Sequence, residues 1–117
     1  MAELFRSLRA AGKQIFIATN SHIDYGNAIL EATLGPEWSE LIDFLGYFTC
    51  KPHFFTHGTP FFEADPLVPD NRGPAADETE LKAHTRYLFG NYQDMEKFFE
   101  ARLGKERGSL QILWFGD

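Results

Sequence analysis

Three short polar segments in this chain each follow an apolar run, which is how buried parallel strands deliver side chains to the carboxyl edge of an α/β sheet. They are Thr19-Asn20-Ser21 after Gln14–Ala18, Lys51 after Phe44–Thr49, and Asp117 after Leu110–Phe115. Hydroxyls, an amide and an ammonium suit a phosphate, whereas a carboxylate at such an edge suits Mg²⁺. The sequence therefore predicts a phosphate-handling site where the three segments meet.

Each segment also has a plainer interpretation. Ser and Asn are common helix N-caps, so Thr19-Asn20-Ser21 could simply begin a helix. Most lysines are solvated, and Lys51 could be one of them. Asp117 could equally be a solvated residue at the end of the chain. The site therefore depends on the three segments meeting in space.

The histidines and the single cysteine are weaker candidates. Cys50 excludes an internal disulfide, fits a reducing compartment, and is expected to be a small buried hydrophobe rather than a nucleophile. His53 and His57 lie four residues apart, but Gly58 and Pro60 crowd them and no acidic helix joins them. We leave this pair out of the predicted site.

Composition limits the classes of protein and partner. A length of 117 residues suits one domain, and a hydrophobic content of 44%, including 12 phenylalanines, supports a core rich in rings. Eleven basic against 17 acidic residues give a net charge of −6, which makes nucleic acid a poor partner. An apolar run of about 18 residues is lacking, so we predict a cytoplasmic protein without a membrane partner.

The apolar spacing predicts an α/β fold with a parallel sheet, right-handed crossovers and flanking helices. Leu4, Phe5, Leu8 and Ala11 mark a first helix that stops at Gly12, and strand Gln14–Ala18 follows. Further along come a helix from Ser21 or His22 to Gly35-Pro36, a turn with Trp38, Leu41 and Ile42, strand Phe44–Thr49, a helix with Tyr92, Met95, Phe99 and Leu103, and strand Leu110–Phe115.

The segment Thr56–Ala83 breaks this alternation. It contains Pro60, Pro66, Pro69 and Pro74 together with acidic residues and has no sustained apolar period. We predict a surface insertion or partly disordered loop over about 56–83 in an otherwise single domain, 1–117. Leu81–Phe89 could close it as either a short helix or a strand.

Taken together, the motifs resemble the haloacid dehalogenase-like superfamily, and within it the cytosolic purine 5′-nucleotidases and their nucleotidase-domain-containing relatives. The resemblance rests on Ile-Phe-Ile-Ala-Thr-Asn-Ser at 15–21, Lys-Pro-His-Phe-Phe at 51–55, Gly-Asn-Tyr-Gln at 90–93 and Leu-Trp-Phe-Gly-Asp at 113–117. It covers most of the chain except 63–83. It implies a partial Rossmann-like haloacid dehalogenase core.

The resemblance also implies a chemistry. Such enzymes are Mg²⁺-dependent phosphatases that hydrolyse nucleoside 5′-monophosphates through a phospho-aspartate formed by an Asp-x-Asp motif. Carried over to this sequence, Thr19 and Asn20 would bind phosphate and Lys51 would steady the phospho-aspartate. Asp117 would be a ligand of Mg²⁺.

One part of that pattern is missing from this sequence. Its aspartates are Asp24, Asp43, Asp65, Asp70, Asp77, Asp94 and Asp117, and no two are separated by a single residue. We expect the nucleophile motif and a nucleoside-binding cap domain before Met1, and further acids after Asp117. The chain alone is therefore expected to be inactive.

Two other functions remain open. The chain could be a non-catalytic structural or interaction subunit that keeps the fold, with a protein partner or the remainder of the domain bound to it. A small-anion binding module using Thr19 and Lys51 is a weaker alternative, because the cap is missing.

Overall fold

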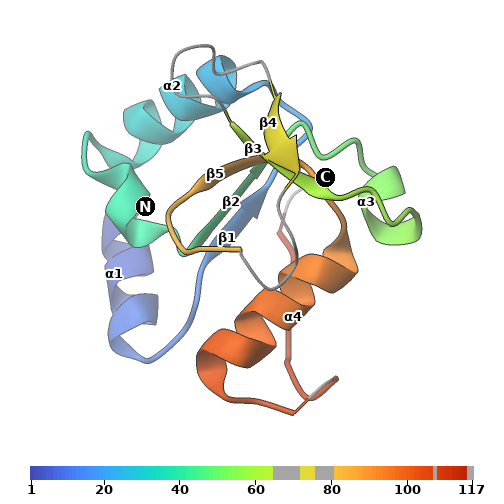
Figure 1. Cartoon of the computed structure of the whole chain (residues 1–117). Coiled ribbons are helices and arrows are strands. Elements are labelled where there is room, and N and C mark those ends of the chain that lie inside the picture. The colour runs from blue at the N-terminus through green and yellow to red at the C-terminus, as the bar shows by residue number, and fades with distance from the viewer. Residues whose placement is uncertain (65–71, 76–80, 107, 116–117) are drawn as a thin grey trace.

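The computed structural model describes residues 1–64, 72–75, 81–106 and 108–115, with residues 72–75 described by their backbone alone. It is an α/β fold in which helices flank a five-stranded sheet of order β1-β2-β5-β3-β4 (Figure 1). The strands are β1 Phe16–Ala18, β2 Phe44–Tyr47, β3 Phe61–Ala64, β4 Arg72–Ala75 and β5 Arg86–Phe89. The helices are α1 Ala2–Ala10, α2 Ile23–Leu34, the 3₁₀ helix η1 Trp38–Leu41, α3 His53–Thr56 and α4 Tyr92–Leu103.

The sheet is mixed, so the prediction of an all-parallel sheet is correct only for β1, β2 and β5. Phe16 pairs with Phe44 in the parallel β1–β2 ladder, and β2 pairs parallel with β5. Strand β3 instead runs antiparallel to both β5 and β4. Antiparallel neighbours need only a short connection, whereas a parallel pair needs a crossover, and the chain between β3 and β4 is short.

Part of the predicted insertion belongs to the sheet. Phe61–Ala64 and Arg72–Ala75 are strands rather than irregular chain, and the Phe61 ring is 1% exposed. Arg86–Phe89 is a strand as well, which decides the alternative left open for Leu81–Phe89. Prolines around short strands had hidden the two-residue period. Residues 65–71 and 76–80 of the predicted insertion lie outside the described residues.

The core consists of two apolar clusters, one on each face of the sheet. Successive residues of β2 alternate between them, because side chains along a strand point to opposite faces: Phe44 joins one cluster and Leu45 the other. The first cluster also holds buried residues of α3 and α4, such as Phe54 and Met95, and the second holds Ile23 of α2. Figure 1 shows α4 on the side of the sheet away from α1 and α2.

A buried carboxylate holds the beginning of the first two strands together. Asp43 is fully buried, and its Oδ2 accepts a hydrogen bond of 2.8 Å from the Ile15 N–H. Arg9 of α1 lies 2.6 Å from Oδ2 of Asp43 and forms an ion pair with it, although the two groups are not aligned for a hydrogen bond. Arg102 of α4 lies 3.5 Å from Oδ1 of Asp43. Elements from both sides of the sheet are thus fixed to the point where β1 and β2 start.

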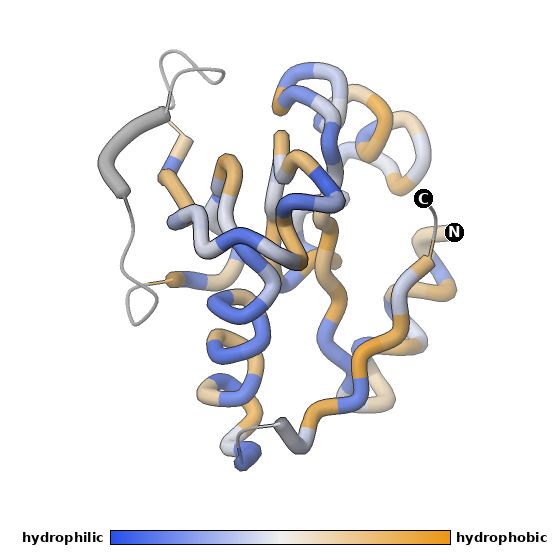
Figure 2. Tube along the Cα trace, turned by 90° about the vertical axis from the view of Figure 1, so that its right-hand side faces the viewer, coloured by the Kyte–Doolittle hydropathy of each residue, from blue (hydrophilic) through white to orange (hydrophobic). Residues whose placement is uncertain are grey.

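The predicted last strand is absent. Residues Leu110–Phe115 pair with no strand in the described part of the chain. Figure 2 shows them as a mostly apolar segment running beside the sheet. Trp114 holds the segment there through edge contacts with Phe16, at 4.7 Å between ring centroids, and with Phe55, at 5.1 Å. Aromatic packing therefore replaces the ladder that the apolar run of this segment predicts.

Candidate functional site

The loops after β1 and β2 lie side by side at the carboxyl edge of the sheet. Thr19 donates its backbone N–H to the Gly46 carbonyl at 3.0 Å, and its own carbonyl accepts the Thr49 N–H at 3.0 Å. These bonds extend the parallel ladder beyond the last residue of each strand. The side chains that follow the two strands are consequently brought to one place.

Asn20 joins the two loops through its side chain. Its Oδ1 accepts the Lys51 N–H at 2.7 Å and the Thr49 hydroxyl at 3.2 Å, while its Nδ2 donates to the Lys51 carbonyl at 3.4 Å. A primary amide has two N–H donors, so one remains for a ligand. The Asn20 side chain thus fixes the position of the Lys51 backbone in the loop after β2.

Thr19 lies where β1 gives way to α2. Its Oγ1 accepts the Ser21 N–H at 3.1 Å, which leaves the hydroxyl proton to donate elsewhere. Helix α2 begins directly afterwards with His22 as its N-cap, whose side chain makes no capping hydrogen bond. The predicted helix start is therefore correct, and the first N–H groups of a 12-residue helix open beside Thr19.

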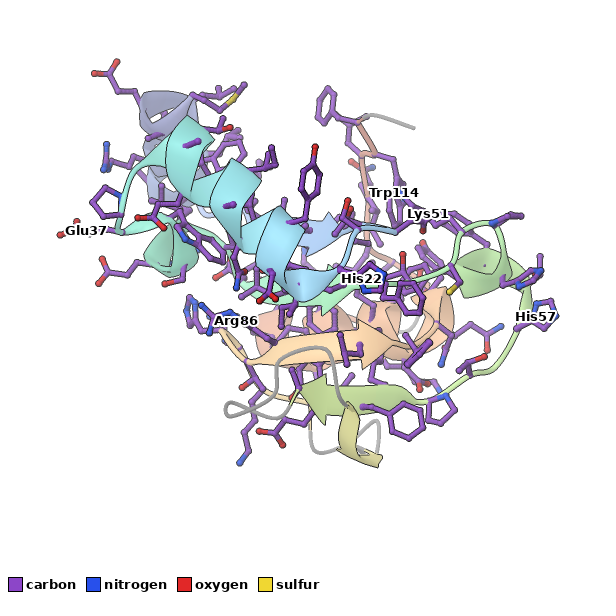
Figure 3. All side chains as sticks on the ribbon, turned by 90° about the horizontal axis from the view of Figure 1, so that it is seen from above. His22, Glu37, Lys51, His57, Arg86 and Trp114 are labelled. Atoms are coloured by element: carbon purple, nitrogen blue, oxygen red, sulfur yellow. The ribbon has the colours of Figure 1, made fainter. Side chains whose placement is uncertain are left out.

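The loop that carries Lys51 has a constrained backbone. Phe48 and Cys50 adopt positive φ angles of 49° and 57°, a region that costs a non-glycine residue about 1 kcal/mol or more. The Phe48 N–H donates to the Ser21 carbonyl at 3.0 Å. Figure 3 shows Lys51 and His22 on neighbouring loops. The half-buried Lys51 side chain therefore extends from a backbone that is held in place.

Two neighbours of this edge were missed by sequence reasoning. Thr49 is 2% exposed, and its hydroxyl lies 3.1 Å from the Thr19 carbonyl as well as near Asn20. A hydroxyl ending an apolar strand was the available signal. The His22 ring stacks on Phe48 with centroids 4.7 Å apart and 22° between the ring planes. Nothing in the local sequence pairs those two rings.

The fourth residue predicted for this edge is the magnesium ligand. Asp117 lies outside the described residues. Within the described ranges, no three His, Cys, Asp or Glu side chains are grouped closely enough to hold a metal ion. The residues of these loops carry a hydroxyl, an amide, backbone N–H groups and an ammonium, all of which suit an anion rather than Mg²⁺. The described residues alone therefore do not fit a magnesium centre.

No helix in the described ranges is long and apolar enough to span a lipid bilayer.

Comparison with known proteins assigns the chain to a family. The model of the 5′ nucleotidase family matches residues 1–117. The 5′-nucleotidase domain-containing protein 2 of Rattus norvegicus is 33% identical over 113 residues, covering 94% of this chain and 18% of that protein. The human 5′-nucleotidase domain-containing protein 1 is 38% identical over 115 residues, covering 96% of this chain and 24% of that protein. The chain spans about a fifth of the length of these curated relatives, and it belongs to the 5′ nucleotidase family.

Proposed function

We propose that this chain provides the phosphate-binding edge of a phosphatase that hydrolyses nucleoside 5′-monophosphates. Family membership and the names of the relatives support a nucleotidase-like function. The observation that carries the proposal is the bridge from Asn20 to the Lys51 backbone, with N–H to Oδ1 at 2.7 Å. Because of it, the loops that carry these two residues, 31 positions apart in the sequence, are joined at one edge of the sheet.

The proposed role of each residue follows from its hydrogen-bonding capacity. Thr19 donates its hydroxyl proton to a phosphate oxygen, and the first N–H groups of α2 favour the negative charge. Asn20 donates its second amide hydrogen while it holds the loop. Lys51 supplies a positive charge to the phosphoryl group as charge accumulates on its oxygens.

In this proposal the chain binds phosphate but does not hydrolyse a nucleotide by itself. A phospho-aspartate route needs a carboxylate nucleophile with a second acid nearby, and the 117 residues contain no Asp-x-Asp pair. Removing a covalent nucleophile leaves only the contribution of binding and electrostatics. A magnesium ion, with Asp117 as one ligand, would act together with the nucleophile that these residues lack, and we assign no step to it.

Hydrolysis assays test this division. The purified 117-residue chain is expected to release no phosphate from AMP or IMP in Mg²⁺, above the level of its Lys51→Ala variant. A longer version that supplies an Asp-x-Asp motif before residue 1 is expected to gain the activity, and to lose it again with Lys51→Ala. Robust Mg²⁺-dependent hydrolysis by the 117-residue chain, abolished by Lys51→Ala, would contradict the proposal.

The absence of an Asp-x-Asp pair from these residues also favours a second candidate, a non-catalytic structural or interaction subunit with the same fold. The longer version distinguishes the two. If it is folded, contains the motif and is still inert toward nucleoside 5′-monophosphates, the interaction subunit becomes the better account.

A further inference from the structure

Two histidines face each other along α3, of which His53 is the first residue and His57 the C-cap. The His57 N–H donates to the His53 carbonyl at 2.8 Å, so one helical turn separates the two residues. Their ring centroids lie 4.4 Å apart, with 45° between the planes. Both side chains are exposed, and Figure 3 shows His57 projecting beyond the helix. Side chains four residues apart on a helix share one face.

We propose that His53 and His57 form a binding site for a late first-row divalent cation, of the class of Ni²⁺ or Zn²⁺. An imidazole nitrogen binds such an ion at about 2.0–2.1 Å, which puts each ring centroid about 3.2 Å from the metal. Two centroids 4.4 Å apart then subtend about 90° at the ion. Adjacent ligands in octahedral or tetragonal coordination make that angle, so the rings need little rearrangement.

A third side chain orients one of the rings. The Thr56 Oγ1 lies 2.8 Å from the His57 Nδ1, which engages that nitrogen and leaves Nε2 for a ligand. Metal-binding histidines are commonly held in this way through their other nitrogen, and loss of such a partner typically weakens metal binding by about 10–100-fold. The Thr56 contact is therefore part of the proposed site.

The two histidines also line a cavity that can hold the ion's remaining ligands. The cavity measures about 160 Å³ and its other walls are Thr49, Cys50, Thr59, Phe89 and Gly90. Because the described ranges group no three metal-binding side chains, the site has two imidazole ligands and water completes the coordination. Imidazole selects nickel, copper and zinc over magnesium, so the ion proposed here differs from the magnesium predicted for Asp117.

Calorimetric titration of the folded 117-residue chain with NiCl₂ at pH 8 tests the site, because a metal ion binds an imidazole through a deprotonated ring nitrogen. One Ni²⁺ is expected to bind per chain. Thr56→Val is expected to weaken binding about tenfold or more, and His57→Ala to weaken it further. In NMR spectra, Ni²⁺ should broaden the ring signals of His53 and His57 before those of the other histidines.

Two variants serve as matched controls. His84 contacts the Ser39 carbonyl through its Nδ1 at 3.1 Å and lies outside the cavity, so His84→Ala should keep the wild-type affinity. Cys50→Ser should also keep it, since the thiol is not one of the two ligands. Unchanged nickel binding in His57→Ala, or its loss in Cys50→Ser while the protein stays folded, would overturn the proposal. Magnesium at the same concentration should give no heat of binding.

Discussion

Replacing Asn20 with alanine removes the side chain that joins the loops after β1 and β2. Three hydrogen bonds disappear, two through Oδ1 at 2.7 and 3.2 Å and a longer one through Nδ2 at 3.4 Å. An intramolecular hydrogen bond contributes about 0.5–1.5 kcal/mol net, and the exposed position of Asn20 lets water replace part of it. We expect the free energy of unfolding to fall by about 1–3 kcal/mol.

Urea denaturation followed by circular dichroism measures that loss, and a domain of this size should also show a melting temperature lower by about 4 °C per kcal/mol. Asn20→Asp is the matched control, because it keeps the Oδ1 acceptor for Lys51 and Thr49 but loses the Nδ2 donor. The aspartate variant should therefore be more stable than the alanine variant, yet bind phosphate more weakly because its carboxylate repels the anion. An Asn20→Ala protein as stable as wild type would refute the view that this amide organises the site.

Two further predictions concern packing and titration. Gly90 has a φ of +87°, and a Cβ there would lie 2.0 Å from the buried Phe61 ring, so Gly90→Ala should lower the free energy of unfolding by about 3 kcal/mol or more. Gly104→Ala, at a φ of +65° with open space around it, should lower it by only about 1 kcal/mol in the same denaturation experiment, and equal losses would contradict the packing argument. Burial raises the pKa of Tyr47 to about 12, so its neutral form contributes stability that is complete below pH 10 and lost between pH 10 and 12, at about 1.4 kcal/mol per pH unit. Tyr47→Phe should reduce this loss without abolishing it, because burial also raises the pKa of Tyr87, and an unchanged slope in denaturation measured from pH 9 to 12 would contradict the assignment.

The sequence predicted the elements whose periodicity is strong and local. The helix spacing of Tyr92, Met95 and Phe99, followed by Gly104, corresponds to α4, whose C-cap glycine is left-handed. The strand before Thr19 was also found, because a buried parallel strand is a continuous apolar run.

The predictions that were wrong concern segments whose structure depends on tertiary contacts. Residues Leu110–Phe115 have the composition of a strand, but aromatic contacts through Trp114 hold the segment without a ladder. Conversely, β3 is a strand of four residues next to Pro60, too short for its period to stand out, and its antiparallel pairing with β5 and β4 makes it one. Strand pairing is a non-local property that a local pattern does not contain.

For the candidate site, the sequence indicated residue types but not the contacts between them. Small polar residues after two strands indicated that Thr19 and Lys51 would share an edge. Nothing in the sequence indicated that the Asn20 amide would bind the Lys51 backbone, that Thr49 would lie beneath both loops, or that His22 would stack on Phe48. Those contacts join residues far apart in the sequence, and the loop after β2 that takes part in them has positive φ angles at Phe48 and Cys50.

The most direct test of the central claim is an NMR titration of the ¹⁵N-labelled 117-residue chain with inorganic phosphate and with AMP. If this edge binds phosphate, the amide signals of Thr19, Ser21 and Lys51 should shift together with one affinity for each ligand. The shifts should disappear in Lys51→Met, while those of α4 stay constant. Folded protein whose Thr19 and Lys51 signals do not move, or whose shifts survive Lys51→Met unchanged, would contradict the account.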